Sequence, residues 1–167
     1  MKNKILALVT GGTFDKEYDM ITGKLFFKDT HLPDIFKRGR STLDITVRTL
    51  MMVDSLEMSD QDREIVAQNC IKSEFDHIII THGTDTMVKT AEVIASKKIE
   101  TKTIILLGAM IPYTFGVSSD GFFNLGAALA YVQAKDPGVY IAMHGECFDW
   151  QNVRKNKETG YFVRLDQ

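Results

Sequence analysis

Short, almost wholly apolar runs recur along the chain and alternate with helical patterns. Continuous apolar runs of this length are typical of strands buried on both faces of a parallel sheet. Residues 43–47 instead alternate apolar and polar side chains, which predicts a weaker strand or one nearer the edge of the sheet. The four continuous runs are residues 5–9, 77–80, 103–107 and 139–143.

Three helical patterns lie between these runs. Ser59 with Asp62 three residues later has the form of a capping box, which predicts a helix from there to about Lys72. A second helix is predicted over 86–96. A third, over 122–134, is rich in alanine and apolar nearly all round, so we expect it to be covered on more than one side. The first helix should bury a stripe formed by Ile65, Val66, Asn69, Cys70 and Ile71.

The alternation of strands and helices predicts right-handed βαβ crossovers. The expected fold class is therefore α/β, with three layers and a doubly wound, mostly parallel sheet. A length of 167 residues predicts one domain, 1–167, large enough to bury a core. Residues 15–40 show no clear period, which predicts a long mobile loop that is either a lid or binding loop or disordered.

Composition and charge narrow the class of protein. Hydrophobic residues make up 44% and charged residues 25%, values typical of globular domains, and a net charge of −2 predicts no nucleic-acid partner. No apolar run approaches the ~18 residues of a membrane span, so no membrane partner is expected. Cys70 and Cys147 cannot form a disulfide framework. With no secretory leader recognisable, the sequence predicts a cytoplasmic protein.

Hydroxyl and carboxyl groups follow several of the predicted strands. Ligands of open parallel sheets bind outside the carboxyl ends of the strands. This rule makes the segments that follow the predicted strands candidate binding loops, namely residues 10–13, 81–85, 108–110 and 144–146. The Thr84–Asp85 pair stands at the mouth of a predicted helix, whose free N–H groups favour a bound carboxylate. The simpler alternative is that these glycine-containing segments are only turns. That alternative leaves the clustering of polar groups unexplained.

Cofactor and metal sites find little support in the sequence. The dinucleotide-binding fingerprint is incomplete after Gly12, and no phosphate-binding loop is present. His82, His144 and Cys147 lack the paired spacing of zinc motifs. We therefore expect neither a metal nor a cofactor.

Five sequence blocks together resemble one family. They are LVTGGT at 8–13, DSLEM at 54–58, ITHGTDTM at 80–87, LGAMIP at 107–112 and SDGFFNL at 119–125. In order and spacing these blocks resemble the bacterial L-asparaginase/glutaminase family, and the chain's length resembles its short single-domain L-asparaginases. The resemblance implies the fold of that family's N-terminal domain, without the C-terminal domain of full-length members.

The resemblance also implies an activity, the hydrolysis of L-asparagine to L-aspartate and ammonia. Thr13 matches the family's nucleophile, and Thr84, Asp85 and Lys155 match its second catalytic group. Tyr18 is the candidate for the tyrosine that activates the first threonine. A threonine hydroxyl needs a base within hydrogen-bond reach, which such groups supply.

Substrate contacts follow from the same resemblance. Ser55, beside Asp54, would hold the α-carboxylate of the substrate, and Asp85 its α-ammonium group. Leu56 stands where longer relatives carry a polar side chain, which predicts weaker affinity. The substrate-binding set is Asp54, Ser55, Leu56, Gly83 and Ala109, the last through its backbone near the scissile amide.

The sequence leaves more than one function open, and the resemblance also implies partners. The resemblance implies a small-molecule substrate, L-asparagine, and a homo-oligomer, a dimer or tetramer. Two other functions stay open: an amidase for another amide such as glutamine, and a non-catalytic module that binds aspartate or asparagine.

Overall fold

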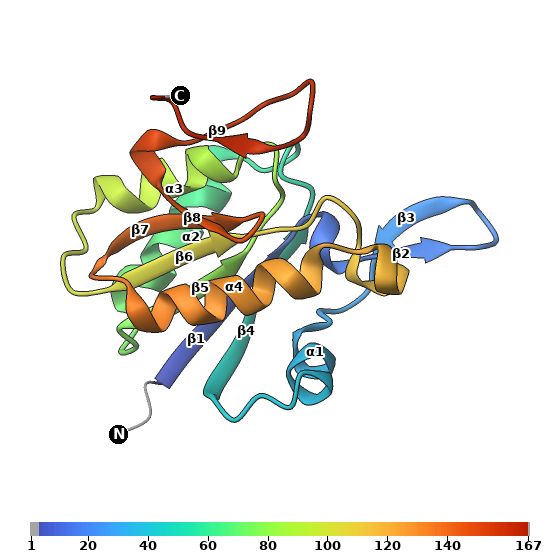
Figure 1. The fold of residues 1–167 in the computed structure, drawn as a ribbon, viewed down its shortest axis with the longest axis horizontal. Coiled ribbons are helices and arrows are strands. Elements are labelled where there is room, and N and C mark those ends of the chain that lie inside the picture. Colours follow the sequence, from blue (N-terminus) through green and yellow to red (C-terminus); the bar gives the residue numbers. More distant parts are fainter. Residues whose placement is uncertain (1–3, 167) are drawn as a thin grey trace.

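A computed structural model describes residues 4–166 and shows one six-stranded sheet flanked by helices (Figure 1). The strand order is β4-β1-β5-β6-β7-β8; neighbouring strands are parallel except β7 and β8, which are antiparallel. These strands are β1 (Lys4–Gly11), β4 (Asp44–Val53), β5 (His77–Thr81), β6 (Thr103–Leu107), β7 (Gly138–Met143) and β8 (Glu146–Asp149). The predicted α/β class with a mostly parallel sheet is confirmed.

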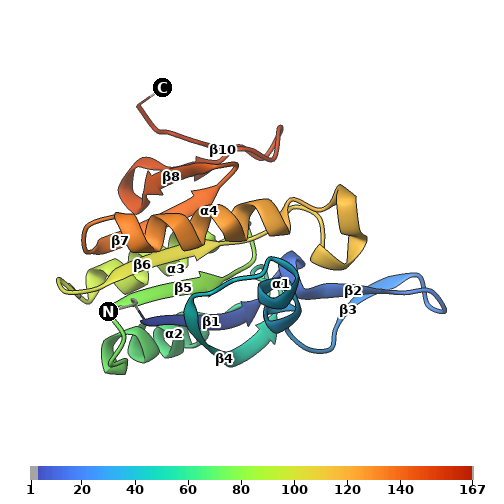
Figure 2. The same ribbon diagram turned by 60° about the horizontal axis from the view of Figure 1, so that its bottom comes forward.

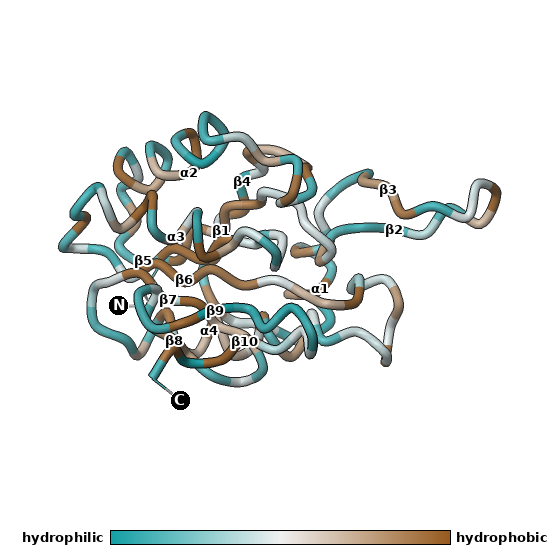
Figure 3. Tube along the Cα trace, turned by 90° about the horizontal axis from the view of Figure 1, so that it is seen from above, coloured by the Kyte–Doolittle hydropathy of each residue, from teal (hydrophilic) through white to brown (hydrophobic). Residues whose placement is uncertain are grey.

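Helices cover both faces of the sheet, which gives three layers (Figure 2). On one face α2 (Asp60–Lys72) and α3 (Met87–Ser96) pack against the side chains of Leu6, Ile78 and Ile104 and their neighbours. On the other face α1 (Leu32–Arg38) and α4 (Gly121–Ala134) cover the alternate residues of the same strands. The central strands are therefore buried on both faces, as their continuous apolar runs predict (Figure 3).

The predicted strands and helices lie where expected, with small changes at their ends. The alternating segment forms β4, an edge strand, which confirms that prediction. Ser59 caps α2 and forms a complete capping box with Asp62. The buried stripe of α2 differs from expectation, because Ile65 and Ile71 are exposed. The helix instead buries Arg63, Val66, Ala67 and Cys70.

Helix α4 is covered on one side only within the described chain. It buries Gly121, Asn124, Leu125, Ala128 and Val132, whereas Phe122 and Phe123 are exposed. The expectation of coverage on several sides is thus not met by the elements of this chain. The outer face of α4 is exposed and carries no charged side chain.

Residues 15–40 contain more regular structure than their sequence predicts. A short 3₁₀ turn, η1 (Thr13–Asp15), leads into the antiparallel hairpin β2 (Lys16–Asp19) and β3 (Lys24–Phe27), and α1 follows. The hairpin extends away from the sheet (Figure 1). Asp15 is buried and accepts a hydrogen bond from the backbone N–H of His31, which ties the segment after the hairpin back to η1.

The remaining elements lie after β6. They are η2 (Tyr113–Ser118), η3 (Trp150–Asn152) and the small hairpin of β9 (Arg154–Lys155) and β10 (Phe162–Val163). None of the helices within residues 4–166 has the length and apolar character needed to cross a membrane.

Candidate active site

The loops after β1 and β5 pack backbone to backbone through two glycines. Gly12 has φ 73°, and a Cβ at this position would lie 2.4 Å from the backbone N of Gly83. A Cβ at Gly83 would in turn lie 2.5 Å from Oγ of Ser55, in the loop after β4. No side chain fits at either glycine. The contact therefore brings Thr13 and Thr84, the residues that follow the glycines, to the same end of the sheet as Ser55.

Thr84 belongs to a polar group formed by two elements far apart in sequence. Lys155, on β9, donates hydrogen bonds from Nζ to Thr84 Oγ1 at 2.8 Å and to Asp85 Oδ1 at 2.7 Å. Thr84 is 7% exposed, whereas the Asp85 side chain is 44% exposed. The hydroxyl is thus held by an ammonium group, and the carboxylate is open to solvent. The structure brings together the three residues predicted for the second catalytic group.

Thr13 lies in the first turn after β1 and is half-buried. In the part of the chain that the structure describes, its hydroxyl forms no hydrogen bond with another side chain. The oxygen is therefore free to contact a substrate. The base that a threonine nucleophile needs is not assembled around it.

Ser55 and Asp54 lie at the end of β4, beside the Gly83 loop. Ser55 is 1% exposed, and its Oγ, which lies against Gly83, has no hydrogen-bond partner among the described residues. Asp54 forms an ion pair with Lys16 at the base of the hairpin. Hydrogen bonding from Lys16 holds the pKa of the Asp54 carboxyl below its usual value, with a further contribution from the charge of Lys155.

Two further predicted positions differ in how they can face a ligand. Leu56 follows Ser55, and its side chain is 72% exposed, so it offers no polar group to a ligand. Ala109, after β6, is buried in the core beneath α4, so only its backbone can face the site. A hollow of about 510 Å³ lies beside Lys155 and is lined by residues 154–158, without the other predicted site residues.

The structure does not bring Tyr18 into this cluster. Tyr18 lies on β2, in the projecting hairpin, and is 55% exposed. Its hydroxyl is near Gly23, in the turn of the same hairpin. The five-residue separation from Thr13 suggests proximity, but the extended strand carries Tyr18 away from the sheet.

His82, between β5 and Thr84, is a fully buried neutral imidazole. Its Nδ1 lies 2.8 Å from the carbonyl O of Gly83, and its Nε2 lies 2.7 Å from Thr90 Oγ1. A carbonyl can only accept, so Nδ1 carries the proton and the Thr90 hydroxyl donates to Nε2. Burial lowers the pKa of His82 to about 4. The ring therefore fixes the Gly83 loop to α3 and is not exposed for proton transfer.

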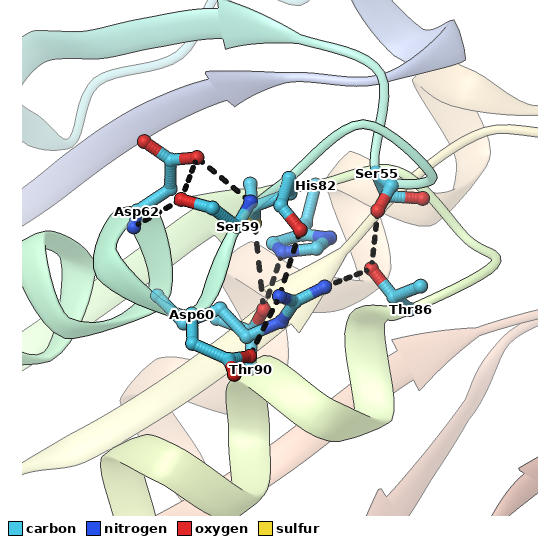
Figure 4. Close-up of polar contacts among 9 residues, drawn as sticks. Ser55, Ser59, Asp60, Asp62, His82, Thr86 and Thr90 are labelled. Carbon is cyan, nitrogen blue, oxygen red and sulfur yellow. Dashed lines mark hydrogen bonds and ion pairs between the residues drawn. The ribbon is translucent and has the colours of Figure 1, made fainter.

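Sequence reasoning missed Arg63, a buried cation on α2; Figure 4 shows its hydrogen-bond partner Thr86 and the neighbouring Ser55. Arg63 donates from Nη1 to the carbonyl of Met58 at 2.9 Å and from Nη2 to Thr86 Oγ1 at 3.0 Å. A charged residue in the first turn of a helix normally faces solvent, so the pattern gave no signal.

The histidines and cysteines considered as metal ligands are engaged elsewhere or isolated. Within residues 4–166, no group of three or more His, Cys, Asp or Glu side chains is arranged to hold a metal ion. Both ring nitrogens of His82 are engaged, and His144 Nε2 accepts a hydrogen bond from the backbone N–H of Phe162. Cys70 and Cys147 are free thiols.

Comparison with known proteins identifies the relatives of this arrangement. The family model described as "Asparaginase, N-terminal" matches residues 4–162. The glutaminase-asparaginase of Acinetobacter glutaminasificans is 28% identical over 180 residues, covering 97% of this chain and 53% of that protein. A subunit of the glutamyl-tRNA(Gln) amidotransferase of Methanococcus vannielii is 33% identical over 156 residues, covering 89% of this chain and 36% of that protein.

A solved structure supports the same relationship. The thermostable L-asparaginase from Thermococcus kodakarensis superposes with a TM-score of 0.84 at 27% identity, covering 98% of this chain and 52% of that one. The chain thus spans about half or less of the length of these relatives.

Proposed function

Because the chain belongs to the asparaginase family, in the part that the N-terminal model describes, we propose that it is an amidohydrolase that converts L-asparagine to L-aspartate and ammonia. The family relationship supports hydrolysis of an asparagine- or glutamine-type amide. The choice of asparagine and of a threonine nucleophile belongs to the proposal. We propose further that residues 1–167 form one catalytic domain.

The proposed reaction uses the two threonines in sequence. Thr13 Oγ adds to the carbon of the side-chain amide and passes its proton to Thr84 Oγ1, while the proton of the Thr84 hydroxyl passes to the departing nitrogen. Lys155 and Asp85 hold the Thr84 hydroxyl in place. Ammonia leaves and an ester to Thr13 remains. A water molecule then adds to the ester carbon and releases aspartate, while its proton restores the Thr13 hydroxyl. Preorganised donors at the oxyanion would contribute most of the rate enhancement.

Recognition of the amino-acid end of the substrate is assigned to the neighbouring loops. The unpartnered Ser55 hydroxyl suits a carboxylate acceptor, since it can donate its proton. The half-exposed Asp85 carboxylate suits an ammonium group. Gly83 and the Ala109 backbone would line the space between them, and Asp54 would hold the Ser55 loop through Lys16.

One observation carries the proposal: Lys155 Nζ donates to Thr84 Oγ1 at 2.8 Å and to Asp85 at 2.7 Å, across 70 residues of sequence. The test is ammonia release from purified protein over a wide range of L-asparagine concentrations, with Thr84→Ala alongside. Release that the variant abolishes would support the proposal. No release, with L-aspartate still raising the melting temperature, would favour a non-catalytic binding module.

Glutamine is the second candidate substrate. Two of the relatives above are named for glutaminase or for a glutamyl-tRNA(Gln) amidotransferase, which is the observation that favours it. Comparing kcat/KM for L-asparagine and L-glutamine decides between them. A clear preference for glutamine would replace the proposed substrate while leaving the residue roles in place.

Assembly and location complete the proposal. We propose a homo-oligomer, a dimer or tetramer, that uses the uncharged outer face of α4 around Phe122 and Phe123. Light scattering during size-exclusion chromatography would test it, with Phe123→Asp expected to shift the mass towards the monomer. We propose a cytoplasmic location on the basis of the two free thiols. Fractionation of cells that express the protein tests that part.

A further inference from the structure

Arg63 is a buried cation to which the proposed reaction assigns no role. The residue is 4% exposed, and the one carboxylate within ion-pair distance among the described residues is Asp60, at 3.4 Å, whose side chain is fully exposed. Arg63 Nε has no hydrogen-bond partner in the described chain. Burying a charge with so little compensation is costly, and an apolar side chain would fill the space at a lower cost.

The contacts of Arg63 form a tether between two loops of the site. Figure 4 shows its second link, between Thr86 and Ser55. Arg63 Nη2 donates to Thr86 Oγ1 at 3.0 Å, and the Thr86 hydroxyl donates to the carbonyl of Ser55 at 2.8 Å. The chain of donors thus runs from the first turn of α2, through the start of α3, to the loop after β4. A charged donor at its head polarises and strengthens the second hydrogen bond.

The tether joins the two parts of the site that are proposed to bind the charged groups of the substrate. Thr86 directly follows Asp85, the proposed partner of the α-ammonium group, and Ser55 is the proposed partner of the α-carboxylate. We propose that Arg63 is a positioning residue that sets the spacing between Ser55 and Asp85 through Thr86, and so determines affinity for the charged amino-acid end of the substrate. This inference rests on the proposed function of the site.

The chain supplies a matched control at the opposite end of the sheet. Lys102 is also buried, 7% exposed, and donates from Nζ to the carbonyls of Ser73 at 2.7 Å and Phe75 at 3.0 Å. Like Arg63, it is a buried cation whose hydrogen bonds hold neighbouring segments together. It does so before β5 and β6 begin, away from the proposed site. A purely structural role would make the two cations equivalent.

The experiment measures kcat and KM for L-asparagine, the dissociation constant of L-aspartate by calorimetry, and the melting temperature. We expect Arg63→Met and Thr86→Val each to raise KM and the dissociation constant about tenfold, the loss typical of one hydrogen bond to a charged group, with kcat reduced less than about threefold. Thr86→Ser should restore both values. The double variant should be no worse than either single one, because both act through one tether.

Lys102→Met should lower the melting temperature and leave KM unchanged. If Arg63→Met and Thr86→Val lower the melting temperature but leave KM and aspartate binding within about twofold of wild type, Arg63 is only structural and the inference is wrong. Should Arg63→Met fail to fold, Thr86→Val decides alone. Wild-type protein that neither hydrolyses an amide nor binds L-aspartate overturns the proposed function and this inference together, whereas an active wild type with unaffected variants overturns the inference alone.

Discussion

The two threonines of the site lie in contrasting surroundings. Thr84 is buried and hydrogen-bonded to Lys155, and its loop is fixed by His82 and by the Arg63–Thr86 tether. Thr13 is half-buried, has no side-chain partner in the described chain, and precedes a hairpin that extends away from the sheet. In the proposed mechanism, the group around Thr84 is assembled from within this chain before substrate would bind. The group around Thr13 would depend on the substrate or on partners that the described residues do not supply.

Replacing the threonines tests this contrast most strongly. Thr13→Ala and Thr84→Ala should each lower kcat about 1,000-fold, because each removes a hydroxyl that takes part in bond making or proton transfer. Only Thr84→Ala should also lower the melting temperature, since Thr84 alone is packed and hydrogen-bonded. Steady-state kinetics and thermal unfolding measure both effects. Activity retained in either variant would remove that residue from the mechanism.

Lowering the pH should destabilise the folded protein through His82, which holds the loop that carries Thr84. The unfolded imidazole binds a proton below pH 6.5, but the folded one, whose pKa is lowered by burial, binds it only below about 4. The contribution of His82 to the free energy of unfolding is therefore fully present above pH 6.5. It declines by about 3 kcal/mol in total as the pH falls to about 4. Urea unfolding at several pH values measures the decline. His82→Gln should flatten it.

Loss of the ion pair between Lys16, which follows Thr13 in the chain, and Asp54 should lower the stability of the protein only slightly. Lys16→Met removes the partner of Asp54, and both side chains are partly exposed, so we expect a loss of about 1 kcal/mol or less in the free energy of unfolding. The pKa of Asp54 should rise towards its usual value, because Lys16 is the main cause of its depression. NMR titration of the Asp54 carboxyl tests this. An unchanged Asp54 pKa would show that the pair does not persist in solution.

Tyr18→Phe should have the smallest effect. Because Tyr18 lies on a projecting hairpin and is 55% exposed, kcat should stay within about threefold of wild type. A fall of more than about tenfold would show that the hairpin closes over the substrate. That result would return Tyr18 to the role that its position in the sequence suggests, and the group around Thr13 would then be completed by hairpin closure.

Strands and site loops could be predicted from the sequence because each depends on local patterns. A continuous apolar run such as residues 103–107 forms a central strand wherever helices cover both faces, and a glycine with hydroxyls directly after it indicates the ligand-binding edge. The hairpin and α1 could not be predicted, because short elements held by contacts such as Asp15 with His31 carry no period of their own. Arg63 was missed for a related reason: its burial results from carbonyls and a hydroxyl on other loops, which no helical pattern records.

The contact between Gly12 and Gly83 also bears on how this protein could acquire a new specificity. A side chain at Gly12 would push apart the main chains that carry the two threonines, and one at Gly83 would collide with Ser55, so these positions offer no room for variation. Leu56 is the opposite case, since its side chain is largely exposed and can be exchanged without disturbing the loops. Variant libraries aimed at other amides should therefore leave the glycines untouched and diversify Leu56 first, where a new contact with substrate is gained without a change in the architecture.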